Sequence, residues 1–245
     1  MRSALAAEGI RKRFGGLWAV DGVTLRPEPS SIVGLIGPNG SGKTTLLNVL
    51  NGVYKPDEGR VLLGDVDVTG RSPHQLAAAG VSRTFQTPRV FKSVTVMENM
   101  LTPTLHLHGR RAGFVDRANQ LLELVNLIDK RDQAASELSG GQQKLLEFAR
   151  ALVTDPHVVL MDEPFAGVHP TIKEVLQGRI LAANEEGTGF IIVSHEVPDL
   201  IAMSEWLVCM DQGSAISEGL PTDVQQDDQV VTAYLGQPVG AGDDQ

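Results

Sequence analysis

The stretch "SIVGLIGPNGSGKTTLLNVLNG", residues 31–52, decides the fold. It opens with a continuous apolar run over 31–37, which predicts a buried strand, and it closes with leucines and a valine at helical spacing before Gly52. Between them, "GPNGSGKT" over 37–44 fits the pattern G-x-x-x-x-G-K-[ST] in full. Because this pattern lies between a strand and a helix, it predicts a phosphate loop and hence an α/β P-loop NTPase.

The residues of this loop suit the binding of a nucleotide and a metal. Its glycines let the backbone N–H groups turn inward, where they and the positive end of the next helix bind anionic oxygens. Lys43 is expected to reach the β- and γ-phosphates of a bound nucleotide, and the Thr44 hydroxyl to bind Mg²⁺. The predicted nucleotide-binding residues of the loop are Gly37, Pro38, Asn39, Gly40, Ser41, Gly42, Lys43, Thr44 and Thr45.

Two adjacent carboxylates follow the apolar run "VVLM" at 158–161. Neighbouring side chains at the end of an extended strand point to opposite sides, so Asp162 and Glu163 should have different tasks. Asp162 is placed to support the Mg²⁺ beside the phosphate loop. Glu163 is then free to orient or deprotonate the attacking water.

The composition sets limits on the kind of protein. A length of 245 residues suits one large domain or a domain with a subdomain. The net charge of −9 argues against nucleic acid as a partner, and the single cysteine, Cys209, allows neither an internal disulfide nor a cysteine-based zinc site. No stretch approaches the roughly 18 apolar residues of a membrane span, and the N-terminus lacks a signal-peptide core, so we expect a soluble chain whose membrane role depends on partners.

Strand and helix patterns alternate at both ends of the chain, which predicts a mainly parallel sheet with right-handed crossovers. Residues 81–86, "VSRTFQ", are predicted to form a strand that ends at Gln86. From 93 to 151 the patterns are mostly helical, which indicates an inserted helical subdomain.

Five motifs together resemble the nucleotide-binding subunit of ATP-binding-cassette (ABC) transporters. They are "GPNGSGKTT", "TFQ", "LSGGQQK", "LMDEP" and "VSHE", and they occur in the family's order between about residues 5 and 236. The resemblance implies the ABC ATPase fold, with a parallel core sheet, an antiparallel β subdomain and the helical insert. The implied organisation is one domain over 1–236, with a core at about 1–85 and 152–236, a helical subdomain at about 86–151 and a flexible tail at 237–245.

The segment "LSGGQQK", 138–144, implies a dimer. Its serine and glycines open a helix whose N-terminal amides form a second anion site. In the family this site faces the γ-phosphate that the other subunit binds, so two ATP molecules lie in a head-to-tail sandwich with two-fold symmetry. The residues that carry this role over are Ser139, Gly140, Gly141 and Gln142.

The resemblance assigns further roles around the ATP. Gln86 is implied to contact Mg²⁺ and the attacking water, and His195 to contact the γ-phosphate and position that water. Phe14 lies where the family carries an aromatic ring that stacks on adenine. His169 stands where the family usually has aspartate or asparagine at the contact with the partner subunit; a contact function and a neutral substitution both remain open.

The segment 80–101, "GVSRTFQTPRVFKSVTVMENML", resembles the ATPases of importers for branched-chain amino acids and their relatives for urea and amides. Two transmembrane permease subunits are implied as partners, and the groove from Gln86 to about Leu101 is expected to receive a short helix from a membrane subunit, with Phe91, Val94 and Met97 as lining residues. The resemblance further implies a paralogous second ATPase, although a homodimer is possible, an indirect link to a solute-binding protein, and a location at the cytoplasmic face of the membrane. The alternatives are an ATPase for lipopolysaccharide extraction, a nucleotide-binding regulatory module without turnover, and a soluble phosphotransferase.

Overall fold

A six-stranded sheet forms the centre of the molecule, which is a computed structural model that describes residues 2–105 and 111–235. Four of its neighbouring strand pairs are parallel, and only β10 runs antiparallel to its neighbour β9. This confirms the predicted mainly parallel core sheet. In spatial order the strands are β10 (Ser214–Gly219), β9 (Trp206–Asp211), β3 (Ile32–Ile36), β8 (Gly189–Val193), β7 (Val158–Asp162) and β6 (Val81–Arg83).

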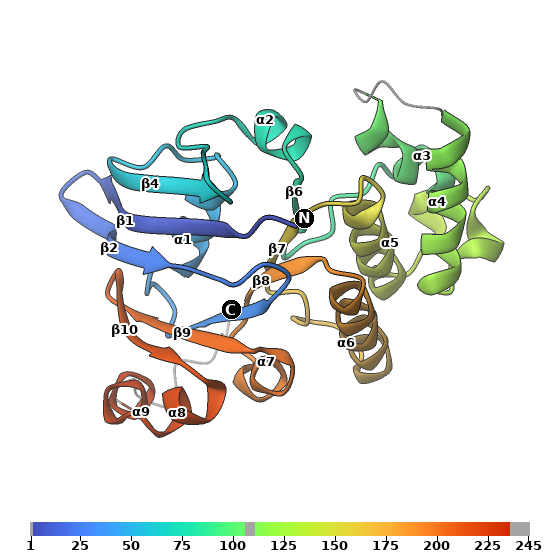
Figure 1. Cartoon of the computed structure of the whole chain (residues 1–245). Coiled ribbons are helices and arrows are strands. Elements are labelled where there is room, and N and C mark those ends of the chain that lie inside the picture. Colours follow the sequence, from blue (N-terminus) through green and yellow to red (C-terminus); the bar gives the residue numbers. More distant parts are fainter. Residues whose placement is uncertain (1, 106–110, 236–245) are drawn as a thin grey trace.

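A second, antiparallel sheet lies beside the first and carries the N-terminal strands (Figure 1). All its neighbouring pairs are antiparallel, as the ABC resemblance implies. Its strands, in spatial order, are β2 (Leu17–Leu25), β1 (Leu5–Phe14), β4 (Glu58–Leu63) and β5 (Val66–Asp67).

The parallel sheet separates two hydrophobic cores. Successive side chains of a strand point to opposite faces, so Ile32 and Ile36 of β3 join one core while Val33 and Leu35 join the other. The first core extends into the helical segment, where Phe148 stacks on Phe190 of β8 with ring centroids 6.5 Å apart. The second core contains the helix after the phosphate loop and the antiparallel sheet.

Nine α-helices surround the sheets in the part of the chain that is described. Figure 1 shows α3, α4 and α5 together at one side, away from the antiparallel sheet. The helices are α1 (Lys43–Leu50), α2 (Pro73–Ala78), α3 (Val96–Leu101), α4 (Arg111–Leu124), α5 (Gly140–Leu152), α6 (Pro170–Glu185), α7 (Val197–Met203), α8 (Pro221–Gln226) and α9 (Asp228–Leu235), with short 3₁₀ turns at Thr102–Thr104, Ile128–Lys130 and Ala135–Glu137.

The predicted strand over 81–86 is too long, because β6 ends at Arg83. The Thr84 N–H still bonds the Leu160 carbonyl of β7, but the Phe85 N–H turns to the carboxylate of Glu147 on α5. Gln86 therefore lies in an irregular segment beyond the sheet.

Two further expectations concern the chain as a whole. Cys209 is buried in β9 and forms no disulfide among the described residues. Within those residues, no helix combines the length and apolarity needed to cross a membrane. The predicted tail at 237–245 lies outside the described residues.

Candidate nucleotide-binding site

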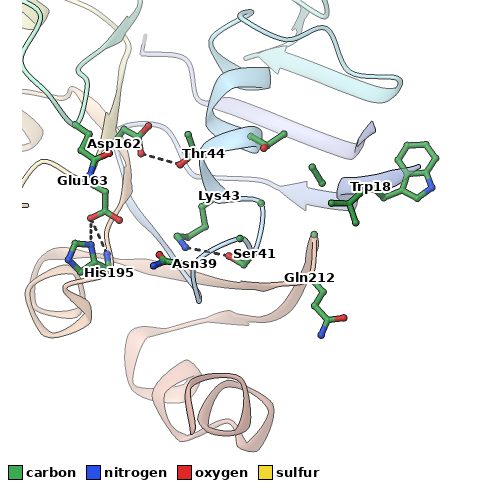
Figure 2. A pocket seen from close by; sticks show the side chains of 16 residues that line it. Trp18, Asn39, Ser41, Lys43, Thr44, Asp162, Glu163, His195 and Gln212 are labelled. Atoms are coloured by element: carbon green, nitrogen blue, oxygen red, sulfur yellow. Dashed lines mark hydrogen bonds and ion pairs between the residues drawn. The ribbon is translucent and has the colours of Figure 1, made fainter. Parts of the chain in front are cut away.

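An open cleft of roughly 870 Å³ lies beyond the carboxyl ends of β3, β7 and β8, the edge where parallel α/β sheets bind ligands (Figure 2). It gathers segments that are far apart in the sequence. Of the predicted site residues, it is lined by Asn39, Gly40, Ser41, Gly42, Lys43, Thr44, Thr45, Gln86, Asp162, Glu163 and His195.

The phosphate loop packs closely between β2 and the turn after β9, and at two of its positions only glycine fits. A Cβ atom on Gly42 (φ 103°) would lie 2.2 Å from the carbonyl oxygen of Ala19, and one on Gly37 (φ 140°) would lie 2.0 Å from that of Met210. The Gly213 N–H, in the turn after β9, donates to the Ser41 carbonyl over 3.0 Å. The loop is thus fixed by its surroundings as well as by its own sequence.

Lys43 places its ammonium group inside the loop. Its Nζ donates to the carbonyl oxygens of Gly37 at 2.7 Å and Pro38 at 2.9 Å, and to the Ser41 hydroxyl at 3.4 Å. Burial lowers the pKa of Lys43, although the nearby carboxylates of Glu163 and Asp162 oppose this shift. A buried cation surrounded by uncharged oxygens is well placed to bind phosphate oxygens instead.

Asp162 and Thr44 meet at the floor of the cleft. The Thr44 hydroxyl lies 3.5 Å from Asp162 Oδ1, so a hydroxyl and a carboxylate converge from α1 and β7 (Figure 2). Hard oxygen donors of this kind fit Mg²⁺, which usually completes its coordination with water and substrate phosphates. These two residues therefore fit the metal role that the sequence predicts for them.

Arg83 of β6, which the sequence analysis did not single out, holds the other oxygen of Asp162. Its Nη2 lies 3.2 Å from Asp162 Oδ2, its Nη1 donates to Asn48 Oδ1 at 2.6 Å, and its side chain is almost fully buried. Burial lowers the pKa of Arg83, and the Asp162 carboxylate opposes that shift. The sequence did contain a signal for this role: Arg83 is a cation within a predicted strand, and a buried charge needs a partner.

Replacing Arg83 with methionine should destabilise the protein by about 2 kcal/mol, because Asp162 then keeps a poorly compensated charge. We expect added Mg²⁺ to recover part of this loss. Urea unfolding with and without Mg²⁺ measures both effects. Arg60→Met is the matched control, since it removes an exposed ion pair with Glu8 that should contribute little. Equal losses in the two variants would contradict the role of Arg83.

Glu163 leaves the strand immediately after Asp162. Its backbone is left-handed (φ 48°), an unusual conformation for a residue with a side chain, although its N–H still donates to the Val193 carbonyl of β8 at 2.9 Å. The two carboxylates are therefore separated by a sharp turn and not by the alternation of an extended strand. Glu163 Oε2 lies 2.7 Å from His195 Nδ1 and accepts the His195 backbone N–H at 3.2 Å. Figure 2 shows this pair at one side of the cleft.

The segment that contains Gln86 is tied to α5. Glu147 accepts the backbone N–H of Phe85 at 3.3 Å and of Arg89 at 2.9 Å, and Arg150, one turn later, donates to the Arg89 carbonyl at 2.5 Å. Burial raises the pKa of Glu147, while these N–H donors act in the opposite direction. The helix that begins with the "LSGGQ" glycines thus holds the loop after β6.

Phe14 does not line the cleft. Its ring packs edge-on against Tyr54, with centroids 5.2 Å apart, and 45% of the residue is exposed. Its stacking on adenine stays a prediction, which the lining of the cleft does not support. Trp18 lines the cleft instead, with its ring beside the guanidinium groups of Arg11 and Arg13. Other lining residues that the sequence analysis missed are Leu17, Ala19, Gln212 and Gly213.

The start of α5 lies outside this cleft. Ser139 caps the helix: its hydroxyl accepts the Gln142 N–H at 3.3 Å, and the Gln142 side chain accepts the Ser139 N–H at 3.0 Å. Ser139 and Gly140 are exposed. By the general geometry of helix ends, the Gly140 and Gly141 N–H groups have no partner within the helix.

His169 caps the start of α6, where its Nδ1 accepts the Thr171 N–H at 3.4 Å, and it is exposed. Replacing His169 with aspartate should raise stability by about 0.5–1 kcal/mol, because a carboxylate is a stronger cap and suits the helix dipole. Thermal unfolding of the two proteins side by side tests this; equal midpoints would contradict it.

The phosphate loop, the paired carboxylates and the parallel sheet define the class of phosphate-loop NTPases. An ABC transporter family model matches residues 20–166. The chain is 38% identical to a probable branched-chain amino acid transport ATP-binding protein of Archaeoglobus fulgidus, over 95% of each chain. It is 37% identical to a high-affinity branched-chain amino acid transport ATP-binding protein of Escherichia coli K12, over 95% of this chain and 98% of that one.

A solved structure shares the fold over nearly the whole chain. It is the ADP conformation of an ATP-binding cassette of an ABC transporter, with a TM-score of 0.87 and 36% identity, covering 97% of this chain and all of that one. The chain belongs to the ABC transporter family, and it is an ATPase of that family.

Proposed function

We propose that this chain is the ATP-hydrolysing motor subunit of a membrane importer for branched-chain amino acids or related small polar solutes, at the cytoplasmic face of the membrane. The cleft supports the chemistry, because it brings Lys43, Thr44, Asp162, Glu163 and His195 together. The similarity to transport ATP-binding proteins over 95% of the chain supports the solute class.

In the proposed reaction, the phosphate loop and Lys43 bind the phosphates of ATP, with Thr44 and Asp162 holding the Mg²⁺ that neutralises their charge. The Glu163 carboxylate takes a proton from water as that water attacks the γ-phosphorus. The bond to the bridging oxygen breaks, and ADP and phosphate leave. His195, already paired with Glu163, and Gln86 orient the water.

The second half of each ATP site is proposed to come from another subunit. Ser139, Gly140, Gly141 and Gln142 are separate from the cleft of their own chain and open an accessible helix end. They are available to bind the γ-phosphate in a sister subunit, and exposed His169 is available as a dimer contact. We expect a paralogous partner, with a homodimer as the alternative.

The segment Gln86–Leu101 is proposed to receive a permease subunit. Phe91 is 53% exposed and Val94 is half-buried, which supports their role as lining residues. Met97 is 8% exposed and belongs to the core, so it is removed from the lining set. The contacts of Glu147 and Arg150 link this segment to α5, and the packing of α3 and α4 against α5 supports a helical subdomain at about 86–151.

Reconstitution tests this function. The chain is purified with the membrane subunits that co-elute from detergent and placed in vesicles with their solute-binding protein. We expect leucine, isoleucine or valine to stimulate ATP hydrolysis and to enter the vesicles. Stimulation by lipopolysaccharide, or ATP binding without any phosphate release, would overturn the proposal. Release of phosphate without an acceptor separates this ATPase from a phosphotransferase.

A further inference from the structure

The last described helix reaches back to the start of the phosphate loop. The Gly37 N–H donates to the hydroxyl of Tyr234, on α9, over 2.8 Å. These two residues lie 197 positions apart in the sequence. Tyr234 does not line the cleft, so its contact with the nucleotide site is made entirely through the backbone of the loop.

The contact completes a clamp around Gly37. The Tyr234 hydroxyl accepts the Gly37 N–H, and the Gly37 carbonyl accepts a hydrogen bond from Lys43 Nζ at 2.7 Å. If Lys43 turns to the phosphates of ATP, it can no longer satisfy that carbonyl fully, and Tyr234 remains as the side chain that holds this end of the loop. Gly37 has φ 140° and lies close to the Met210 carbonyl, so no side chain at position 37 could hold this end of the loop in place of Tyr234.

The fold delivers the Tyr234 hydroxyl to this position. Tyr234 packs against the core that includes Val224 of α8 and Val230 of α9. Burial raises the pKa of Tyr234 to about 12, so the phenol stays protonated and neutral at physiological pH while its oxygen accepts the Gly37 N–H. The position of α9 and the shape of the loop are therefore linked by one hydrogen bond.

We propose that Tyr234 is a positioning residue for nucleotide binding, which couples the docking of α9 to the affinity of the phosphate loop. This inference rests on the proposed role of the loop residues. Coupling between two sites is reciprocal, so nucleotide binding should in turn stabilise α9. Since the contact serves ATP and ADP alike, it should affect binding and not the chemical step.

Tyr234→Phe tests the proposal, because it keeps the packed ring and removes only the hydroxyl. We expect the Kd for ATP and for ADP to rise by about threefold to tenfold, with KM rising likewise and kcat at saturating ATP unchanged. Tyr54→Phe is the matched control: it makes the same change at the only other tyrosine, and its Kd should equal that of the parent. An unchanged Kd in Tyr234→Phe would overturn the inference.

Hydrogen exchange of the α9 amides gives a second readout that a purely structural role would not produce. ATP should slow exchange over 230–235 in the parent and have much less effect in Tyr234→Phe. Equal slowing in both would overturn the coupling. Lys43→Ala separates a failure of the proposed site from a failure of the proposed role of Tyr234. Normal ATP binding by Lys43→Ala would refute the site itself. Loss of ATP binding in Lys43→Ala, together with normal binding in Tyr234→Phe, would refute only the role of Tyr234.

Discussion

Replacing Glu163 with glutamine should lower the rate of ATP hydrolysis by about a hundredfold to ten-thousandfold while leaving ATP affinity nearly unchanged. Glutamine keeps the shape of the side chain but has no carboxylate to accept a proton from water. Phosphate release and equilibrium binding of labelled ATP, measured on the same preparation, separate the two effects. We also expect this variant to accumulate as an ATP-bound dimer, visible by light scattering.

The matched control is Glu123→Gln, the same change at an exposed position on α4. It should hydrolyse ATP at the parent rate. If Glu163→Gln also does so, Glu163 is not the base. If it loses binding and hydrolysis together, its main role is to hold the cleft, because its oxygen also accepts the His195 N–H.

Replacing Lys43 with alanine should weaken ATP binding by about a hundredfold. The variant loses a buried ammonium group that is surrounded by loop oxygens in this structure, and a charge-assisted hydrogen bond contributes about 1.5–3 kcal/mol. Isothermal calorimetry with ATP and Mg²⁺ gives the affinity, and Lys55→Ala, at an exposed position after α1, is the control. An affinity within threefold of the parent would show that Lys43 does not hold the phosphates.

The phosphate loop and its flanking elements could be predicted because the signals there are local. The strand over 31–37 and the helix that ends before Gly52 follow from an unbroken apolar run and a 3.6-residue period. Leu46, Leu47, Val49 and Leu50, whose spacing predicted the helix, are all buried on α1. Gly52 ends the helix with φ 71°, where a Cβ atom would lie 2.1 Å from the Arg71 carbonyl.

Features that depend on distant contacts could not be predicted in this way. β6 was expected to run to Gln86, but the Phe85 N–H finds the carboxylate of Glu147, 62 positions away. The Arg83–Asp162 pair and the Tyr234–Gly37 bond likewise join residues whose neighbourhood exists only in the folded chain. A left-handed backbone at Glu163 has no signature in the letters "DEP" either.

The aromatic residues show the same limit. Phe14 and Trp18 lie on neighbouring antiparallel strands, and which of them lines the cleft depends on the local register. That register has irregularities between Lys12 and Arg13. The resemblance of motifs predicts that an aromatic ring lies near the cleft. It does not predict the face of the sheet on which each ring lies.

We propose above all that ATP lies between the phosphate loop of one subunit and the "LSGGQ" segment of another. Vanadate, bound with ADP at the γ-phosphate position, cleaves nearby backbone under ultraviolet light, so mapping the cuts in the whole transporter complex tests the claim directly. We predict cleavage of this chain both in the phosphate loop and at Ser139–Gly141, whether the sister subunit is identical or paralogous. Cleavage confined to the phosphate loop would contradict the account.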